Sequence, residues 1–226
     1  MKKLSGVFVT GTDTEVGKTR ISVGLVKALQ QQRLSVAAMK PVASGCEQTS
    51  EGLRNEDALA LMQQADVKMP YHVINPYAFE PAIAPHLAAM EKAVSIELSV
   101  IEDNFHRLRN KADCVVVEGA GGWLVPMNAQ QTLADLAVTL QLPVIMVVSI
   151  KLGCINHALL TVQAIKHSGL HLLGWVANCV EPSAQQYAVI ESLVSRIEAP
   201  CLGVVPKLAA TESACDYLDI GSVLFD

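Results

Sequence analysis

The sequence predicts an α/β fold, in which a mostly parallel sheet is flanked by helices on both faces. Short aliphatic segments alternate with amphipathic segments along the chain, which is the pattern of strands joined by crossover helices. Of the 226 residues, 51% are hydrophobic but only 4% are aromatic, so the apolar bulk is aliphatic, as in strands buried on both faces. A glycine-bounded loop ending in Gly-Lys-Thr joins the first aliphatic segment to the first amphipathic one, as in P-loop NTPases.

Six aliphatic segments are expected to be the strands. Each is too short for a buried helix, and most end at Gly, Pro, Asn or a charged residue. They cover residues 7–10, 35–39, 114–117, 143–150, 174–178 and 202–205.

Between these strands, apolar residues recur at helical spacing. The first such stripe lies within residues 21–29, the second follows a capping Thr132, and the third covers residues 155–162. No shift in composition marks a boundary, so residues 1–226 are expected to form a single P-loop α/β domain. Residues 75–85 contain three prolines and are expected to be an ordered loop of this domain.

Charge and cysteine content argue against several classes of function. The 17 basic residues against 22 acidic ones give a net charge of −5, so no basic excess indicates a nucleic acid or an anionic membrane as partner. The six cysteines form no CxxC pair and no zinc spacing with histidine, which predicts reduced thiols. The first apolar run is too short for a signal peptide, and the longest, residues 142–150, is about half a membrane span. We therefore expect a cytoplasmic protein.

Residues 11–19, GTDTEVGKT, are the strongest motif. In a phosphate-binding loop, backbone N–H groups and the helix N-terminus face the phosphates. Lys18 would neutralise β- and γ-phosphate oxygens, and the Thr19 hydroxyl would bind Mg²⁺. Five residues separate Gly11 from Gly17, where the common pattern has four. The alternative is a chance match of Gly-Lys-Thr.

Four more polar residues are candidates for the same edge of the sheet. Lys40 precedes a proline at a strand end, which holds it extended where open α/β sheets bind ligands. It could stabilise a transferring phosphoryl group or an anionic substrate, or be a surface lysine. Ser44, in the same loop, could offer a hydroxyl. Glu118 could face a metal from a strand tip or lie solvated in a turn, and Asp57 could be an acid at a helix start without chemistry.

Two later segments also follow strands. Asn178 could read a nucleotide base through its amide group, or cap the strand end. Residues 151–156 combine a lysine, a glycine and a helix start, which could bind an anion or be an ordinary loop.

Together, seven segments resemble the ATP-dependent dethiobiotin synthetases. They are GTDTEVGKT (11–19), KPVASG (40–45), EGLRNEDALAL (51–61), NPYAFEPAIAPH (75–86), VVVEGAGGW (115–123), LPVIMVVSIKLGCINHALLT (142–161) and GWVAN (174–178). The resemblance runs in order from residue 6 to residue 208, and the longer phosphate loop is itself typical of that family. KLGCINHA is its most specific segment.

The resemblance implies a reaction and its cofactors. The family closes a ureido ring on 7,8-diaminononanoate (7,8-diaminopelargonate) with CO2, ATP and Mg²⁺, through a carbamate and a carbamic-phosphoric anhydride. By this resemblance Lys18 and Lys40 are catalytic and stabilise charge on the carbamate and the γ-phosphoryl group, while Thr19, Asp57 and Glu118 surround Mg²⁺. The implied ATP-binding residues are Thr14, Glu15, Val16, Gly17, Lys18, Thr19, Asp57, Glu118, Gly119, Ala120, Gly121, Asn178, Pro206, Lys207 and Leu208.

A homodimer is implied as well, with the substrate site at the subunit interface. Ser44 would contact the substrate, whereas Gly153, Cys154 and Asn156 would bind the carboxylate of a substrate held by the neighbouring subunit. The expected partners are therefore the diamine, CO2 or bicarbonate, ATP and a second copy of the chain.

Two departures and two alternatives accompany this resemblance. Cys179 stands where relatives carry Asp, which leaves base recognition to Asn178 and backbone groups. The residues after Leu208 match nothing in the family, and we expect this segment to pack at the dimer contact or over the base. One alternative is a cobyrinate-synthase-type amide ligase, for whose usual glutaminase domain 226 residues leave no room. The other is a partner-regulated P-loop switch ATPase, which usually has an additional lysine early in the loop, where this chain has Thr12 and Asp13.

Overall fold

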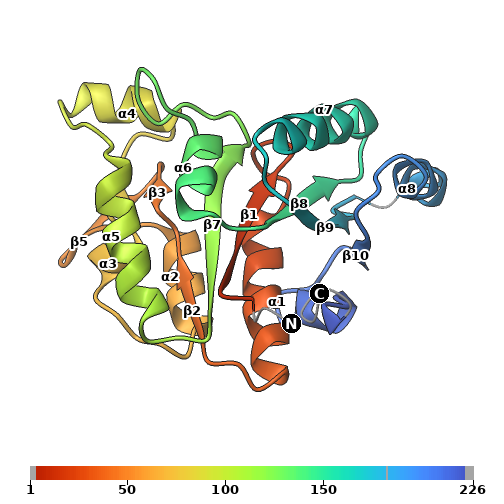
Figure 1. Ribbon diagram of the computed structural model, residues 1–226, viewed down its shortest axis with the longest axis horizontal. Coiled ribbons are helices and arrows are strands. Elements are labelled where there is room, and N and C mark those ends of the chain that lie inside the picture. The colour runs from red at the N-terminus through yellow and green to blue at the C-terminus, as the bar shows by residue number, and fades with distance from the viewer. Residues whose placement is uncertain (1–3, 182, 222–226) are drawn as a thin grey trace.

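The computed structural model describes residues 4–181 and 183–221. Its centre is a six-stranded sheet with the order β10-β9-β8-β1-β7-β2, in which every neighbouring pair is parallel (Figure 1). All six expected segments form strands of this sheet, which confirms the predicted fold class. The strands are β1 (Gly6–Gly11), β2 (Val36–Met39), β7 (Cys114–Gly122), β8 (Val144–Ser149), β9 (Leu172–Asn178) and β10 (Cys201–Val205).

Helices cover both faces of the sheet (Figure 1). The first face is covered by α1 and η1, and the other by α5, α6 and α7, each with its own hydrophobic core. The helices are α1 (Lys18–Gln31), α2 (Glu56–Gln64), α3 (Tyr71–Ile74), α4 (Pro85–Glu91), α5 (Leu98–Arg109), α6 (Leu133–Leu140), α7 (Cys154–His167), α8 (Gln186–Val194) and the 3₁₀ helix η1 (Ala214–Tyr217). Thr132 caps α6 as expected, in a reciprocal capping box with Asp135. Within the described residues, no helix has the length and apolar character needed to cross a membrane.

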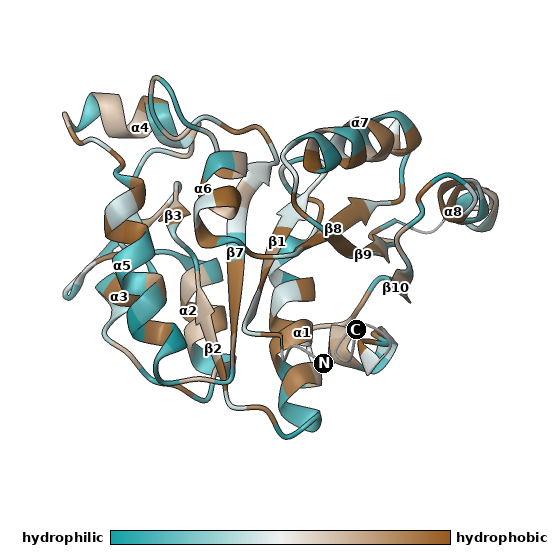
Figure 2. Cartoon of the chain, in the orientation of Figure 1, coloured by the Kyte–Doolittle hydropathy of each residue, from teal (hydrophilic) through white to brown (hydrophobic). Residues whose placement is uncertain are grey.

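Alternate residues of the central strands enter the two cores. Val7 and Val9 pack with α1, whereas Phe8 between them packs on the opposite face, where its ring meets Trp123 edge-on at 6.1 Å. Figure 2 shows the resulting hydrophobic strands at the centre of the molecule. Because both faces are covered, the strands need aliphatic residues at successive positions, which explains the composition.

The structure differs from the expectations at two places. The strand expected to end at residue 117 continues to Gly122, so Glu118 lies inside β7 and not in a solvated turn. Between β2 and α4 the chain adds a parallel pair, β3 (Val42–Ala43) with β6 (Tyr77–Ala78), and a hairpin, β4 (Glu47–Thr49) with β5 (Gly52–Arg54). Strands of two or three residues are too short to show an alternating pattern.

Parallel strands place their carboxyl ends at one edge of the sheet. Strand β1 leads there into the phosphate-loop motif, β2 into Lys40, and β9 ends at Asn178. Since β1 lies between β8 and β7, the chain leaves β1 beside the second half of β7, and Glu118 in the middle of β7 pairs with Val9 of β1. The topology alone therefore brings these sequence-distant motifs together.

Candidate active site

The loop after β1 has the backbone of a phosphate-binding loop. Gly17 directly precedes α1 in the left-handed conformation, with φ of 87°. A Cβ atom at this position would overlap Nδ2 of Asn178, so the position requires glycine for two reasons. The first turn of α1 has no acidic side chain, which keeps its N-terminus open to an anion.

Lys18 is a poorly solvated cation at the start of this helix. Its side chain is 7% exposed, and its Nζ donates to the carbonyl oxygen of Asp13 at 3.1 Å. Burial, and then repulsion from Lys40, lower the pKa of Lys18 from 10.5 to about 8. An anionic ligand would relieve both effects.

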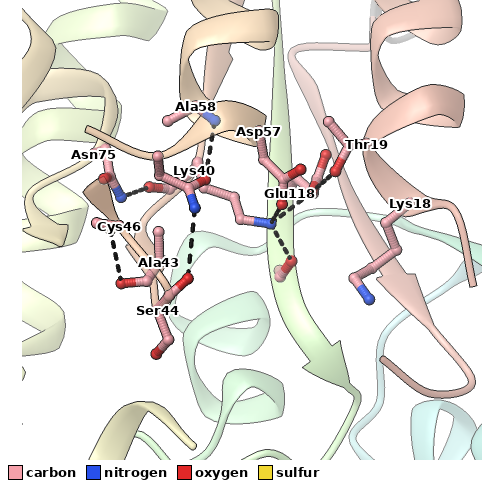
Figure 3. A network of polar contacts seen from close by, with 12 residues as sticks. Lys18, Thr19, Lys40, Ala43, Ser44, Cys46, Asp57, Ala58, Asn75 and Glu118 are labelled. Atoms are coloured by element: carbon pink, nitrogen blue, oxygen red, sulfur yellow. Dashed lines mark hydrogen bonds and ion pairs between the residues drawn. The ribbon is translucent and has the colours of Figure 1, made fainter. Parts of the chain in front are cut away.

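Lys40 lies between two carboxylates at the end of β2 (Figure 3). Its Nζ is 2.6 Å from Oε1 of Glu118 and 2.9 Å from Oδ2 of Asp57, and it donates to the carbonyl oxygen of Gly119 at 3.3 Å. Burial alone would lower the pKa of Lys40, but the carboxylates of Glu118 and Asp57 outweigh it and raise the pKa above its ordinary value. Lys40 is thus a buried, permanently charged ammonium group and not a surface lysine.

Thr19, Asp57 and Glu118 provide oxygen ligands in one place. The Thr19 hydroxyl donates to Oε1 of Glu118 at 2.8 Å, while Oε2 of Glu118 is buried without a hydrogen-bond partner. Asp57 is the second residue of α2 and is half-buried. Burial would raise its pKa, but Lys40, the Thr19 hydroxyl and Lys18 together outweigh this and hold the pKa below its ordinary value. A hydroxyl and two carboxylates, one of which has an unpaired buried oxygen, fit Mg²⁺, which is bound through one or two carboxylates together with substrate phosphates.

A cavity of about 1270 Å³ joins these groups. Its volume is large enough for a nucleotide and a second small molecule. The predicted site residues that line it are Thr14, Glu15, Gly17, Lys18, Thr19, Lys40, Ser44, Asp57, Ala120 and Gly121. The Ser44 hydroxyl is buried there without a partner.

Other predicted site residues lie outside the lining. Val16 and Glu118 are buried behind it, and Gly119 meets Lys40 through its carbonyl group. Pro206, Lys207 and Leu208 follow β10. Gly153, Cys154 and Asn156 form the start of α7 and do not line the cavity of their own chain; Gly153 and Asn156 are exposed there.

Asn178 contacts the phosphate loop directly. Its Nδ2 donates to the carbonyl oxygen of Val16 at 2.8 Å across 162 positions of sequence. The side chain is 7% exposed and does not line the cavity. One of the two amide hydrogens of Asn178 is therefore already engaged with the phosphate loop.

Comparisons with known proteins bear on this site. A family model described as an AAA domain matches residues 5–214. Curated relatives named ATP-dependent dethiobiotin synthetase BioD include one from Pseudomonas paraeruginosa, 53% identical over 204 residues, which covers 89% of this chain and 90% of the relative. Another from Cellvibrio japonicus is 49% identical and covers 96% of each chain. The chain belongs to the dethiobiotin synthetase family. It is accordingly an ATP-dependent ligase.

Solved structures of lower identity share the fold of this dethiobiotin synthetase family member. The septum site-determining protein MinD complexed with Mg-ADP from Pyrococcus horikoshii has a TM-score of 0.58 at 16% identity, covering 92% of this chain and 82% of that chain. A ParA family ATPase from Chlorobium tepidum has a TM-score of 0.53 at 16% identity, covering 88% and 83%. These likenesses establish the P-loop NTPase fold alone, whereas the family assignment rests on the dethiobiotin synthetase relatives.

In this dethiobiotin synthetase family member, the C-terminal segment also contributes to the site, which the sequence motifs do not predict. Arg20 in the first turn of α1 donates to the carbonyl oxygens of Ala209 and Glu212, and Oε2 of Glu212 accepts from the N–H of Ala209 at 2.7 Å. Ala210 and residues 212–214 line the cavity. Gly24 allows this contact, because a Cβ atom there would lie 2.8 Å from the Cβ of Ala214. No sequence motif marks this segment, and the contact depends on tertiary packing; residues 222–226 lie outside the described part of the chain.

Proposed function

We propose that this chain closes the ureido ring of dethiobiotin from 7,8-diaminononanoate, CO2 and ATP. The N7 amine would attack CO2 and lose a proton to give a carbamate. A carbamate oxygen would then attack the γ-phosphorus of ATP, with ADP as the leaving group. Finally the N8 amine would attack the carbonyl carbon, the bond to the phosphate oxygen would break, and phosphate and a proton would be released.

The observation that best supports this chemistry is the pair of buried ammonium groups facing one cavity. The triphosphate, the carbamate and the transferring phosphoryl group bring several negative charges into one site. Lys18 at the start of α1 would face the phosphates, and Lys40 would exchange its carboxylate partners for oxygens of the carbamate and the phosphoryl group. Charge stabilisation and positioning are what phosphoryl transfer requires from a protein.

Thr19, Asp57 and Glu118 would hold Mg²⁺, which supplies neutralising charge to the phosphate oxygens when bound. The residues that would bind ATP are those implied by the resemblance: residues 14–19, Gly119 to Gly121, Asn178 and residues 206–208. Ser44 would hold the diamine, supported by its unpartnered hydroxyl in the cavity.

We further propose a homodimer in which the start of α7 completes the neighbouring site. Gly153 and Asn156 are exposed, Leu152 beside them is fully exposed, and the helix N-terminus there has no acidic residue in its first turn. Such an end can bind the substrate carboxylate. The cytoplasm remains the expected location.

The direct test is product formation from defined substrates. Purified chain with diamine, bicarbonate and ATP-Mg²⁺ should form dethiobiotin, detected by mass spectrometry, with phosphate release that requires both diamine and bicarbonate. Phosphate release driven by DNA or lipid without the diamine would instead indicate a switch ATPase. Release that requires an amide nitrogen donor would indicate an amide ligase.

The dimer is tested by sedimentation and by mixing two inactive chains. Lys40→Met disables a chain's own site, whereas Asn156→Asp places a carboxylate where the substrate carboxylate would bind. A mixed dimer contains one intact site, so the mixture should regain about a quarter of the wild-type activity. A fully active monomer, or no regain from dimers that exchange subunits, would contradict the shared site.

A further inference from the structure

The backbone of Lys40 is hydrogen-bonded to residues 74–75, which have no direct part in the proposed reaction. Its N–H donates to the carbonyl oxygen of Ile74 at 2.9 Å, and its carbonyl oxygen accepts from Nδ2 of Asn75 at 2.6 Å (Figure 3). The same Nδ2 donates to the carbonyl oxygen of Tyr77 at 3.3 Å, and the Asn75 side chain is buried. Both peptide groups beside the Lys40 side chain are therefore fixed from one side.

Tyr71 extends this contact to the helix that carries Asp57. Its hydroxyl donates to Oδ1 of Asn75 at 2.9 Å and accepts from the backbone N–H of Asn55 at 2.8 Å. Asn55 is the N-cap of α2, and its own side chain accepts from the N–H of Ala58. An uninterrupted path of hydrogen bonds thus joins the Lys40 carbonyl to the start of α2.

We infer that Tyr71 and Asn75 are positioning residues that fix Lys40 relative to the N-terminus of α2, and so hold its ammonium group between Asp57 and Glu118. This inference rests on the proposed function, in which Lys40 stabilises the transferring phosphoryl group. Neither residue lines the cavity, so each acts through Lys40 and Asp57.

The chemistry of the two side chains determines which group donates and which accepts in each hydrogen bond of the path. Asn75 faces two carbonyl oxygens with its amide nitrogen, which leaves only its oxygen for Tyr71. Tyr71 must then donate to Asn75 and accept from Asn55, which only a protonated hydroxyl can do. Burial raises the pKa of Tyr71 above its ordinary value, and the Arg54 guanidinium stacks on its ring at 4.3 Å. The hydroxyl consequently stays protonated and the ring stays in place.

The chain itself provides a matched control for the loss of this hydroxyl. The hydroxyl of Tyr77 also accepts from a backbone N–H just before a helix, that of Glu97 before α5. Helix α5 carries none of the proposed site residues. Tyr71→Phe and Tyr77→Phe thus each remove a hydroxyl that accepts from the N-cap of a helix, but only the Tyr71 hydroxyl lies on the path to Lys40. Tyr77 meets Asn75 through its backbone carbonyl oxygen, which Tyr77→Phe retains.

The test compares kcat, KM for ATP and melting temperature of the two variants. Tyr71→Phe should lower kcat about tenfold, because a small displacement of a catalytic group has a large effect on the rate, while KM for ATP changes less than about twofold. Tyr77→Phe should leave kcat unchanged and lower the melting temperature by less than Tyr71→Phe does, since it loses one hydrogen bond whereas Tyr71→Phe loses two. Equal kcat for Tyr71→Phe and wild type, or equal losses in both variants, would overturn the inference.

A second pair of variants separates an effect on Lys40 from a general folding defect. Asn75→Asp keeps the shape but turns a carboxylate oxygen toward two carbonyl oxygens, and should lower kcat more than Tyr71→Phe. Asn75→Gln retains the amide and should recover part of that loss; no recovery at all in a folded Asn75→Gln protein would count against an amide-specific role. Because these comparisons require an active wild type, a wild type that forms no dethiobiotin would refute the proposed function instead.

Discussion

Nζ of Lys40 and Oε1 of Glu118 lie 2.6 Å apart, with 5% and 0% of their side chains exposed. Both side chains are largely removed from bulk water, so each charge depends on the other for stabilisation. Glu118 is also a proposed Mg²⁺ ligand, and Lys40 is the proposed catalytic cation. The carboxylates raise the pKa of Lys40 above its ordinary value, so the ammonium group stays charged before a ligand arrives.

Replacing Lys40 should affect activity and stability together. Lys40→Met removes the cation that faces the phosphoryl group, and turnover should fall by at least about 100-fold. It also leaves Glu118 buried without its cation, which should cost about 3–5 kcal/mol of unfolding free energy. Single-turnover assays and urea denaturation measure the two effects.

The double variant Lys40→Met/Glu118→Gln separates these effects. Removing the second charge should restore much of the lost stability, because the buried charge is gone, and should restore none of the activity. Stability that stays as low in the double variant as in Lys40→Met would argue against the ion pair as the cause.

ATP binding should take up protons near pH 8. Burial lowers the pKa of Lys18 from 10.5 to about 8 in the free protein, and phosphates beside Nζ would raise it again. At pH 8 to 8.5 a fraction of Lys18 is neutral before binding and charged afterwards. Calorimetric titrations in two buffers with different ionisation enthalpies should give different apparent binding enthalpies, and identical enthalpies would contradict the prediction.

The same pKa fixes the pH dependence of stability of the free protein. Between pH 8 and 10.5 the unfolded chain keeps a proton on Lys18 that the folded chain loses. The contribution of Lys18 to stability therefore rises with pH across that window, because the unfolded state binds more protons. Lys18→Met should remove this rise, as measured by denaturation at pH 7.5 and 9.5.

Arg20 should control ATP affinity more than turnover. It holds the backbone of residues 209–212 against α1, where the C-terminal segment lines the cavity. Arg20→Ala should raise KM for ATP by about 3- to 10-fold, as for the loss of hydrogen bonds to a charged group, with kcat little changed. Arg109→Ala removes the same side chain from α5 on the opposite face and is the control. A fall in kcat without a change in KM would refute this role.

Local motifs of this chain can be predicted from its sequence. The phosphate loop, the strand before it and the helix after it lie within about 25 consecutive residues, so spacing alone places Lys18 and Thr19. Lys40 and Glu118 could be assigned to the same edge because parallel strands share an orientation. Their 2.6 Å contact could not, since 78 positions separate them and side-chain packing determines it.

Contacts that side chains make with backbone groups are much harder to predict from the sequence. The glycines after Glu118 are typical of a turn, but pairing with β1 continues the strand through them to Gly122. The hydroxyl of Tyr71 and the guanidinium of Arg20 bond to peptide groups, which every residue has. No residue pattern can therefore mark those partners in advance.

A substitution of Asn178 can distinguish two roles for this residue, recognition of the nucleotide base and support of the phosphate-loop backbone. Its Nδ2 supports the Val16 carbonyl next to Gly17, so Asn178→Asp replaces a donor by a carboxylate oxygen facing a carbonyl. If the residue acts through the loop, ATP and inosine triphosphate should both bind more weakly, by a similar factor of about 10. If it reads only the base, the variant should change the ratio of the two affinities and leave the affinity for inorganic triphosphate intact. We expect the first result, with triphosphate binding weakened in parallel, and competition titrations with the three ligands distinguish the outcomes.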